Sequence, residues 1–429
     1  MKKLLIIGYV WPEPKSSAAG SRMLDIIQLF QMDEWQITFT SAAALSVHRV
    51  NLQALNVEEK LIELNSSSFD DFVSELQPDV VIFDRFFTEE QFSWRVDKAC
   101  PHAMKILDTE DLHCLRAVRQ RLLKEKQKVF TKEVDRQSVE PILLDMQSLY
   151  QEMTNDEECL REIAAIYRCD LSLIISRFEQ QLLADHFQIP EQLCFYYPYQ
   201  SQSYVGLPYS RNPSFLQRQN FLFVGNFRHA PNWDAVLWLK YQLWPRIRQQ
   251  LPEAELHIYG AYPPPKASEL HHPPSGFLIK GWAEDLIVPT QNARVVLAPL
   301  RFGAGLKGKL FEAMKSYTPS VTTSIGAEGI TNGDDWPGTI VDNADSLVEA
   351  AVKLYSNEQF WSIQQAKILP VLTSFLSNVP TKLLVEINRI SGNIESQRAN
   401  NFVGRLLCQE MLRSHKYMGL WIEAKTNHS

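Results

Sequence analysis

Several features that define large protein classes are missing from this chain of 429 residues. Its six cysteines are scattered without Cys-x-x-Cys spacing, which argues against a zinc site or a disulfide framework and fits a reducing compartment. A formal net charge of −7 leaves no basic excess for nonspecific binding of nucleic acid. No apolar run approaches the roughly 20 residues that cross a bilayer, and no repeat or low-complexity tract is present. We therefore expect a globular, cytoplasmic protein that does not bind nucleic acid.

The amino terminus is open to two interpretations. Residues 1–10 begin with two lysines and an apolar run, and small residues follow at 16–20, as in a secretory signal peptide. However, Glu13, Lys15 and two prolines interrupt this pattern. A first buried parallel strand explains the same residues with fewer assumptions, so we favour it.

The sequence is rich in alternating strand and helix patterns. With 45% hydrophobic residues, the chain is long enough for two domains, each with its own core. Apolar runs alternate with amphipathic helical patterns, which is typical of an α/β fold with doubly wound parallel sheets. Pro198, Pro208 and Pro213 lie among polar residues and indicate a linker. The sequence therefore predicts an N-terminal domain over residues 1–200 and a C-terminal domain over residues 215–385. The expected strands are Leu4–Ile7, Gln36–Thr40, Val80–Phe83, Lys105–Leu107 and Leu171–Ser176, then a run from Phe221, Leu256–Tyr259, Gly276–Ile279, Val295–Leu300 and Val321–Thr323.

The most informative stretch covers residues 295–314. It reads as a buried strand, a glycine turn and the start of a helix that carries two lysines. Gly303 and Gly305 allow positive φ and close approach of the backbone. The free N–H groups and positive dipole end of the helix attract a phosphate, and Lys307 and Lys309 add charge there. The pattern predicts an anion-binding site.

Glu312 follows on the same helix, where a carboxylate is well placed to accept hydrogen bonds from both hydroxyls of a ribose. A nucleotide diphosphate would fit the whole stretch. Alternatively, the glycines only turn the chain and Glu312 pairs with Lys309, a contact that contributes about 0.2–0.5 kcal/mol. A second strand ends in another small-residue loop, which carries Ser324 and Glu328. Because loops at the carboxyl ends of neighbouring parallel strands form one crevice, this second loop favours a binding site.

These residues carry a family resemblance. Gly303–Lys309, Leu310–Met314 and Thr323–Gly329 look like the donor-site signature of GT-B glycosyltransferases of family 4, the glycosyl transferases group 1. Phe221–Asn232 is similar to the first strand and loop of that family's C-terminal domain. The resemblance implies a GT-B fold, in which two Rossmann-like domains face an interdomain crevice. It also implies a retaining enzyme that moves a sugar from a nucleotide diphosphate donor to a glycan or lipid-linked acceptor, as in bacterial surface polysaccharide biosynthesis.

The chain departs from the family pattern at three positions. Asn226 stands where the family usually has an arginine, and Pro231 where it has a lysine. Arg228 is the candidate substitute, and more of the diphosphate contact is expected from the two lysines of the glycine loop. Of the family's paired glutamates, Glu312 occupies the second position and Ala304 the first. Members with a glycine-rich loop there use backbone N–H groups for the sugar hydroxyls.

Two N-terminal segments complete the candidate site. The loop after the first strand carries Gly20, beside which a sugar fits, and Arg22, which would either clamp a phosphate or carboxylate or lie on the helix surface. Family members often place a histidine of this domain near the donor sugar, and His113 resembles that position. The alternative is that His113 only packs or caps locally. If it is functional, Asp108 and Asp111 are expected to hold its tautomer.

No Asp-x-Asp motif lies at a strand end, so we expect no metal and no cofactor besides the nucleotide sugar substrate. Cationic side chains and the helix dipole would offset the charge of the leaving diphosphate. Two rival functions stay open. One is a GT-B nucleotide-sugar epimerase or hydrolase, and the other is a noncatalytic subunit that binds a nucleotide sugar without turnover.

Three peripheral segments carry further expectations. Residues 115–132 form a basic amphipathic pattern that would either contact anionic lipid headgroups, placing the enzyme on the inner membrane face, or be a solvated helix face. The polar segment 131–158 is expected to be helical and broken near Pro141. By resemblance to the family, residues 390–429 form a return segment that packs on the first domain.

Overall fold

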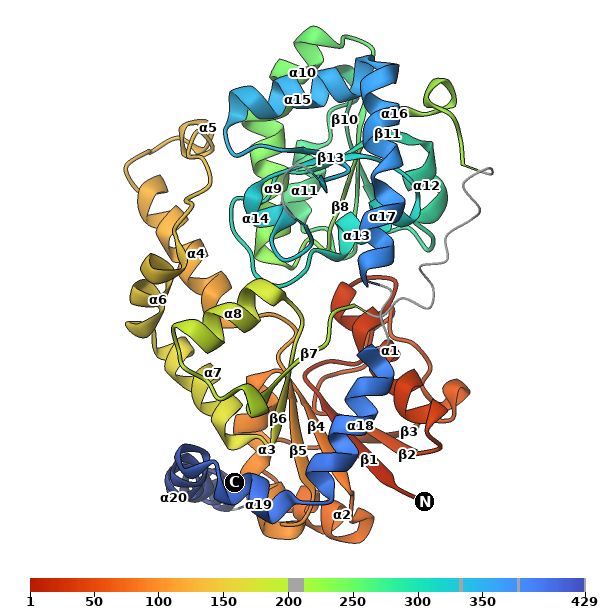
Figure 1. The fold of residues 1–429 in the computed structure, drawn as a ribbon. Helices are drawn as coiled ribbons and strands as arrows, with labels where there is room; N and C mark the ends of the chain where they lie inside the picture. Colours follow the sequence, from red (N-terminus) through yellow and green to blue (C-terminus); the bar gives the residue numbers. More distant parts are fainter. Residues whose placement is uncertain (200–211, 332–334, 376–378, 428–429) are drawn as a thin grey trace.

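The computed structural model describes residues 1–199, 212–331, 335–375 and 379–427, and it contains two parallel β-sheets with helices on both faces (Figure 1). The α/β class with two Rossmann-like domains is therefore confirmed. The expected linker residue Pro208 lies outside the described residues.

The N-terminal sheet has the strand order β3-β2-β1-β4-β5-β6-β7, and all neighbours pair in parallel. Side chains alternate between faces along a strand, so Leu5 and Ile7 enter one core cluster while Leu4 and Ile6 enter the other. Both faces are covered, as the near-continuous apolar strands require. The strands are β1 (Lys3–Gly8), β2 (Gln36–Ser41), β3 (Glu58–Leu61), β4 (Val80–Asp84), β5 (Met104–Asp108), β6 (Leu171–Ile174) and β7 (Cys194–Tyr196).

The helices of this domain include a long excursion between β5 and β6. Four helices lie in that excursion, and the segment reaches toward the other domain at α5 (Figure 1). The helices are α1 (Ala18–Met32), α2 (Ser68–Leu76), α3 (Phe86–Ala99), α4 (His113–Gln127), α5 (Glu133–Arg136), α6 (Met146–Thr154), α7 (Glu157–Arg168) and α8 (Arg177–Asp185).

The C-terminal sheet has the order β10-β9-β8-β11-β12-β13, again all parallel. Its core is built around three buried tryptophans, Trp238, Trp244 and Trp361. The strands are β8 (Gln219–Val224), β9 (Leu256–Tyr259), β10 (Phe277–Gly281), β11 (Ala293–Ala298), β12 (Ser320–Thr322) and β13 (Gly338–Ile340). The helices are α9 (Ala230–Trp238), α10 (Trp244–Gln250), α11 (Pro265–Leu270), α12 (Ile287–Asn292), α13 (Gly308–Lys315), α14 (Ser324–Ala327), α15 (Ala344–Ser356), α16 (Glu358–Ala366) and α17 (Ile368–Phe375).

The chain then returns to the first domain through α18 (Val379–Ser391), α19 (Ile394–Ala399) and α20 (Phe402–Asn427) (Figure 1). Leu383, Ile387 and Ile390 of α18 enter the core beside α1, and α20 packs on α3 and α7. Residues 358–391 contain an 18-residue stretch with a mean hydropathy of 1.4, so by length and composition this segment could span a membrane. Their described parts instead form α16 and α17 on the C-terminal domain and α18 on the N-terminal domain.

The sequence patterns missed three short strands, β3, β7 and β13. Each is an edge strand of its sheet and pairs with a neighbour on one side only. Edge strands are less enclosed than central strands, so their sequences need not be apolar throughout. The sequence of β3 is Glu-Glu-Lys-Leu, which contains no alternation to detect. The basic helix also differs from expectation, because α4 ends at Gln127 rather than continuing to residue 132. Within 131–158 only α5 and α6 are complete helices, and residues 137–145 around Pro141 are nonhelical.

Candidate functional site

A cavity of about 1060 Å³ lies between the two domains and is lined by residues of both. The carboxyl ends of β4 and β5 face it from one side, and the loops after β8 and β11 face it from the other. This is the position where doubly wound sheets bind ligands. The predicted crevice therefore exists, and most of the expected site residues line it.

The glycine loop after β11 makes a close approach to the N-terminal domain. Gly305 has φ 63°, and a Cβ added there would lie 2.8 Å from the Cβ of Asp111. Its N–H donates to Glu179 Oε1 of α8 at 2.7 Å. Of the two loop glycines, which both allow positive φ, Gly305 adopts it and Gly303 does not. Only Gly305 needs the left-handed backbone, because it must touch the facing domain. Ala304 between them lines the cavity and packs against the N-terminal core.

Both lysines of the loop line the cavity. Lys307 is the N-cap residue of α13, and its Nζ donates to the carbonyl of Gly305 at 2.8 Å. Lys309 Nζ donates to Asn232 Oδ1 at 2.6 Å. Burial and the neighbouring Lys307 lower the pKa of Lys309 to about 7, and burial also lowers the pKa of Lys307. Two amines that repel each other beside a helix N-terminus are well suited to hold an anion.

Glu312 lies one turn further along α13 and lines the same cavity. Its carboxylate accepts a hydrogen bond from Lys315 at 2.8 Å, whereas Lys309 is engaged by Asn232. The alternative pairing with Lys309 is therefore absent. The Glu312 side chain is 44% exposed, so its oxygens remain accessible to a ligand.

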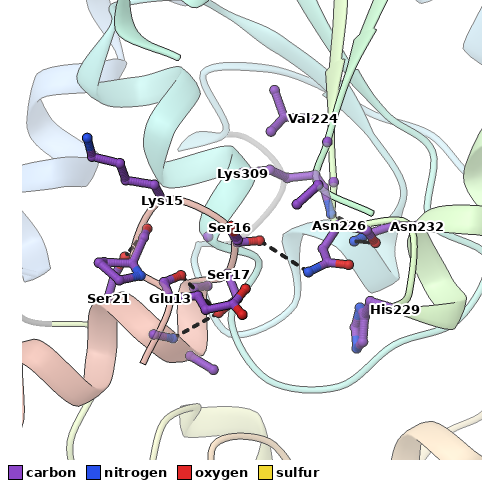
Figure 2. A pocket seen from close by; sticks show the side chains of 18 of the residues that line it. Glu13, Lys15, Ser16, Ser17, Ser21, Val224, Asn226, His229, Asn232 and Lys309 are labelled. Atoms are coloured by element: carbon purple, nitrogen blue, oxygen red, sulfur yellow. Dashed lines mark hydrogen bonds between the residues drawn. The ribbon is translucent and has the colours of Figure 1, made fainter. Parts of the chain in front are cut away.

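The loop after β8 contributes Asn226 and Arg228, which also line the cavity. Asn226 Nδ2 donates across the domain boundary to the carbonyl of Ser16 at 3.4 Å (Figure 2). Asn232 Nδ2 donates to the carbonyl of Asn226 at 2.9 Å, so this amide links the loop to Lys309. The Arg228 guanidinium lies 3.7 Å from the ring centroid of Tyr262.

His113 is the first residue of α4; it is 9% exposed and lines the cavity. Arg116 contacts Nδ1 at 2.8 Å, and because a guanidinium only donates, Nδ1 accepts and Nε2 carries the proton. Burial, with Arg116 and Arg85 nearby, lowers the pKa of His113 to about 3, so the ring is neutral at physiological pH. Nε2–H has no hydrogen-bond partner within the described residues. The nearest carboxylate oxygen, Asp111 Oδ1, lies 3.5 Å from Nε2.

Buried glutamates support this wall of the cavity. Glu162 of α7 accepts the N–H groups of His113 and Cys114 at 3.0 and 2.9 Å, satisfying the first turn of α4. Glu179 accepts the N–H of Leu112 at 3.1 Å as well as that of Gly305. Burial raises the pKa of Glu162 to about 7, and burial together with Asp111 raises that of Glu179 to about 8. The sequence held no signal for either role, because both depend on helix packing.

Arg22 requires a correction. It is fully buried, and its guanidinium contacts Asp108 at 2.8–3.2 Å and also bonds to the carbonyl of Tyr197. It lies behind the cavity wall, so neither the clamp nor the helix-surface interpretation was right. Asp108 is consequently occupied by Arg22 and does not orient His113. Asp111 does lie beside His113, because its Oδ1 is 3.5 Å from Nε2 and its carboxylate bonds to Arg116, which contacts Nδ1. Gly20 does line the cavity, with the backbone of Glu13 so close that a Cβ would lie 2.4 Å away.

Ser324 and Glu328 also lie elsewhere than expected. Ser324 bonds to Asp342, with its N–H donating at 2.7 Å, and Glu328 forms a bidentate pair with Arg119 of α4 at 2.7 and 2.9 Å. Both residues line a separate, smaller cavity of about 180 Å³. Glu328 therefore joins the domains rather than contacting a ligand in the large cavity.

Asp84, Arg85 and Glu110 are among the cavity residues of the N-terminal domain that sequence reasoning missed. Asp84 ends β4, Arg85 follows it, and Glu110 lies two residues beyond β5, so the rule that ligands bind at strand ends was a usable signal. Among the described residues, no group of three or more His, Cys, Asp or Glu side chains is arranged to hold a metal ion.

Comparison with known proteins shows that part of the chain is similar to a known family. Residues 218–357, which contain the glycine loop and α13, match the family model described as glycosyl transferases group 1. A protein from Klebsiella pneumoniae, described as an uncharacterized 44.6 kDa protein in the cps region, is 28% identical over 131 residues, which is 28% of this chain and 33% of that protein. The matched part thus spans a third of the length of this curated relative.

Solved structures similar to the chain are GT-B glycosyltransferases. Sucrose-phosphate synthase from Thermosynechococcus elongatus is 11% identical with a TM-score of 0.63, covering 92% of this chain and 100% of that one. TarM from S. aureus, solved with UDP and alpha-GlcNAc-glycerol, is 10% identical with a TM-score of 0.62, covering 90% and 100%. A glycosyltransferase from Rickettsia africae is 13% identical with a TM-score of 0.59, covering 91% and 98%. The chain therefore has the GT-B fold.

Proposed function

We propose that this protein transfers a sugar from a nucleotide diphosphate donor to a glycan or glycolipid acceptor. The observation that carries the proposal is the glycine loop with Lys307, Lys309 and Glu312, which lies on one wall of a cavity shared by both domains. Two amines at a helix N-terminus suit a diphosphate, and a carboxylate further along the helix suits a ribose diol. The presence of UDP in a structural neighbour makes UDP-sugars the first donors to test.

The proposed mechanism needs no protein nucleophile and no metal. Lys307, Lys309 and the N-terminus of α13 stabilise the leaving diphosphate, which departs from an oxocarbenium-like sugar. His113 Nε2–H donates to a hydroxyl of that sugar, a role consistent with its neutral ring. The acceptor hydroxyl attacks from the face that the diphosphate leaves, and a phosphate oxygen takes its proton. This path retains the anomeric configuration, as the family resemblance implies.

The relative in a cps region favours surface polysaccharide biosynthesis in the cytoplasm. In the segment 115–132, Arg116, Arg119 and Arg121 are paired with carboxylates. A peripheral membrane contact through this segment would therefore rely on its lysines. Lys124, Lys126, Lys128 and Lys132 remain exposed and are the residues available for anionic headgroups.

The test compares nucleoside, nucleoside monophosphate and nucleoside diphosphate binding by calorimetry. Wild-type protein is expected to bind UDP or GDP far better than the bare nucleoside. In the double variant Lys307→Ala, Lys309→Ala, the ratio of diphosphate affinity to nucleoside affinity should fall by at least about tenfold. The reason is that each charge-assisted hydrogen bond contributes about 1.5–3 kcal/mol. Lys266→Ala, an exposed lysine of the same domain, is the control. Equal losses of affinity for nucleoside and for diphosphate in the double variant would contradict the assignment.

A second experiment analyses the reaction products with and without an acceptor. It separates a transferase from a hydrolase or epimerase.

A further inference from the structure

The contact between the domains contains a buried glutamate that does not itself face the cavity. Glu179 lies in the first turn of α8, in the N-terminal domain, and it is fully buried. It is not one of the residues that line the large cavity. The backbone groups that it contacts, however, lead directly to residues that do.

One carboxylate oxygen of Glu179 holds two loops. Oε1 accepts the N–H of Gly305 at 2.7 Å and the N–H of Leu112 at 3.1 Å. Gly305 belongs to the glycine loop of the C-terminal domain, whereas Leu112 directly precedes α4 in the N-terminal domain. Because a carboxylate oxygen has two lone pairs, it can accept both bonds at once. A single atom thus ties the glycine loop to the turn before His113.

The bond to Gly305 completes a set of contacts that hold the glycine loop. Gly305 has φ 63°, and its carbonyl accepts a hydrogen bond from Lys307 Nζ at 2.8 Å, while Glu179 holds its N–H. The carbonyl of Gly303 accepts a bond from Arg119 of α4 at 2.7 Å. Glycines lose more conformational freedom on ordering than other residues, so a loop with several glycines needs outside partners to keep one shape. Two of these partners come from the other domain.

Close packing makes the hydrogen bonds of Glu179 costly to lose. A Cβ added to Gly305 would lie 3.4 Å from Cγ2 of Ile175, which precedes α8. Ile175 joins Leu306, the residue after Gly305, in an apolar cluster shared by the two domains. Without Glu179, the N–H groups of Gly305 and Leu112 would be left at this contact without an acceptor, which is unfavourable for buried donors. The loop is then expected to leave this conformation.

The charged groups around Glu179 indicate which feature of its side chain matters. Asp111 and Lys307 face it, and Arg119 and Glu328 act on Lys307 in turn. Burial and Asp111 raise the pKa of Glu179 to about 8, so the carboxyl group is largely protonated near neutral pH. Oε1 can accept in both protonation states, because the proton can reside on Oε2. The accepting oxygen, rather than a negative charge, is therefore the feature that matters, and glutamine also supplies it.

We propose that Glu179 is a positioning residue, which holds the glycine loop in the conformation that binds a diphosphate without touching the ligand. Nucleotide affinity then depends on contact with the N-terminal domain, although the loop belongs to the C-terminal domain. This inference rests on the proposed function, since it takes the loop to be a diphosphate site. Loss of Glu179 should weaken binding of the diphosphate part of a ligand and spare the nucleoside part.

The first measurement is amide hydrogen exchange, read by mass spectrometry on peptides that contain residues 303–309. A peptide from β1 reports global opening and is the internal reference. Glu179→Ala is expected to speed exchange in the loop at least about fivefold relative to β1, because the N–H of Gly305 loses its acceptor. Glu179→Gln should stay within about twofold of wild type, since its amide oxygen accepts the same bonds.

The second measurement is calorimetry with UDP, GDP and the corresponding nucleosides. In Glu179→Ala the ratio of diphosphate affinity to nucleoside affinity should fall at least about fivefold, whereas Glu179→Gln should keep it within about twofold of wild type. Asp185→Ala, which removes an exposed acid at the end of α8, is the matched control and should equal wild type in both measurements. If Glu179→Ala does not fold, Glu179→Asp, which draws the carboxyl group back by one methylene, should change both readouts in the same direction.

The inference is overturned if the folded alanine or aspartate variant keeps wild-type exchange in the loop. It is also overturned if such a variant melts at a lower temperature but keeps the wild-type affinity ratio, because Glu179 would then support the fold alone. A glutamine variant that loses as much as the alanine variant would overturn it as well, since the charge would then be the important feature. If wild-type protein binds neither UDP nor GDP, the proposed function fails, and the exchange measurement still decides whether Glu179 holds the loop.

Discussion

At the scale of single residues, Lys309 makes nucleotide binding depend on pH. Its pKa is lowered to about 7 by burial and by Lys307, so in the free protein the amine is largely neutral above that pH. A bound diphosphate favours the ammonium form and raises this pKa, so binding above pH 7 takes up a proton. Diphosphate affinity is therefore expected to be highest below pH 7 and to fall by up to about tenfold per pH unit above it.

Calorimetric titration between pH 6 and 9 checks this expectation, with binding enthalpies compared in buffers of different ionisation enthalpy. Lys309→Arg is the matched variant, because a guanidinium stays charged throughout this range and should bind with much weaker pH dependence. A pH profile that is identical in the lysine and arginine forms would show that Lys309 does not titrate on binding.

Glu312 is expected to distinguish ribose from deoxyribose. If its carboxylate accepts both ribose hydroxyls, removal of one hydroxyl should cost about 1.5–3 kcal/mol of binding free energy in wild-type protein. Glu312→Ala should bind the ribonucleotide at least about tenfold more weakly and should lose the preference over the 2′-deoxynucleotide. A double-mutant cycle of enzyme and ligand measures this coupling. If the effects of Glu312→Ala and of removing the 2′-hydroxyl on the binding free energy are additive, Glu312 does not contact the ribose.

At the scale of elements, the segment that follows α4 forms a strap, residues 128–145, from the N-terminal domain to the C-terminal one. Arg301, 1% exposed and two residues before Gly303, donates to the carbonyl of Val139 at 2.7 Å and bonds to the side chain of Gln137. Asp234 holds the other side of this guanidinium at 2.6 and 2.9 Å. The strap therefore holds Arg301, which lies at the start of the glycine loop.

Gln137→Ala should loosen this link. Loss of a buried hydrogen bond to a charged group costs about 1.5–3 kcal/mol, and part of that loss should appear as weaker nucleoside diphosphate binding. Calorimetry and thermal melting measure the two effects, with the exposed Gln53→Ala as the control. Lower stability with unchanged nucleotide affinity would show that the strap serves the fold alone.

At the scale of the whole molecule, Arg119 joins the two domains. Its guanidinium contacts the carbonyl of Gly303 at 2.7 Å and both oxygens of Glu328, and the side chains of this ion pair are only 7% and 11% exposed. Removing one partner of a buried ion pair typically costs about 3–5 kcal/mol. Arg119→Met should therefore shift the protein toward an open form with a larger radius of gyration.

Small-angle scattering with and without a nucleoside diphosphate checks this prediction. Arg121→Met, two residues further on the same helix and paired only with exposed carboxylates, should scatter like wild type. Ligand binding should partly restore the compact form of Arg119→Met, because the ligand favours the closed state. An unchanged radius of gyration in Arg119→Met would show that other interdomain contacts suffice.

The sequence by itself determined the buried strands of both sheets and the residues of the glycine loop. Apolar runs of strand length fix the buried parallel strands, because a strand covered on both faces must be apolar throughout. The glycines, lysines and Glu312 lie within one short stretch, so their proximity follows from local geometry. His113, which follows the end of a strand, also lines the cavity.

Only the tertiary structure decided which charged residues face a ligand and which pair with each other. Arg22 and Asp108 are 86 residues apart, and Arg119 and Glu328 are 209 residues apart, so no local pattern announces either pair. Buried ion pairs form wherever packing brings opposite charges together out of water, and the same residue types on a surface would look identical in the sequence. The physical reason is that spacing along the chain controls local backbone geometry. Long-range packing and burial instead decide whether a charged side chain faces the cavity or pairs with another charge.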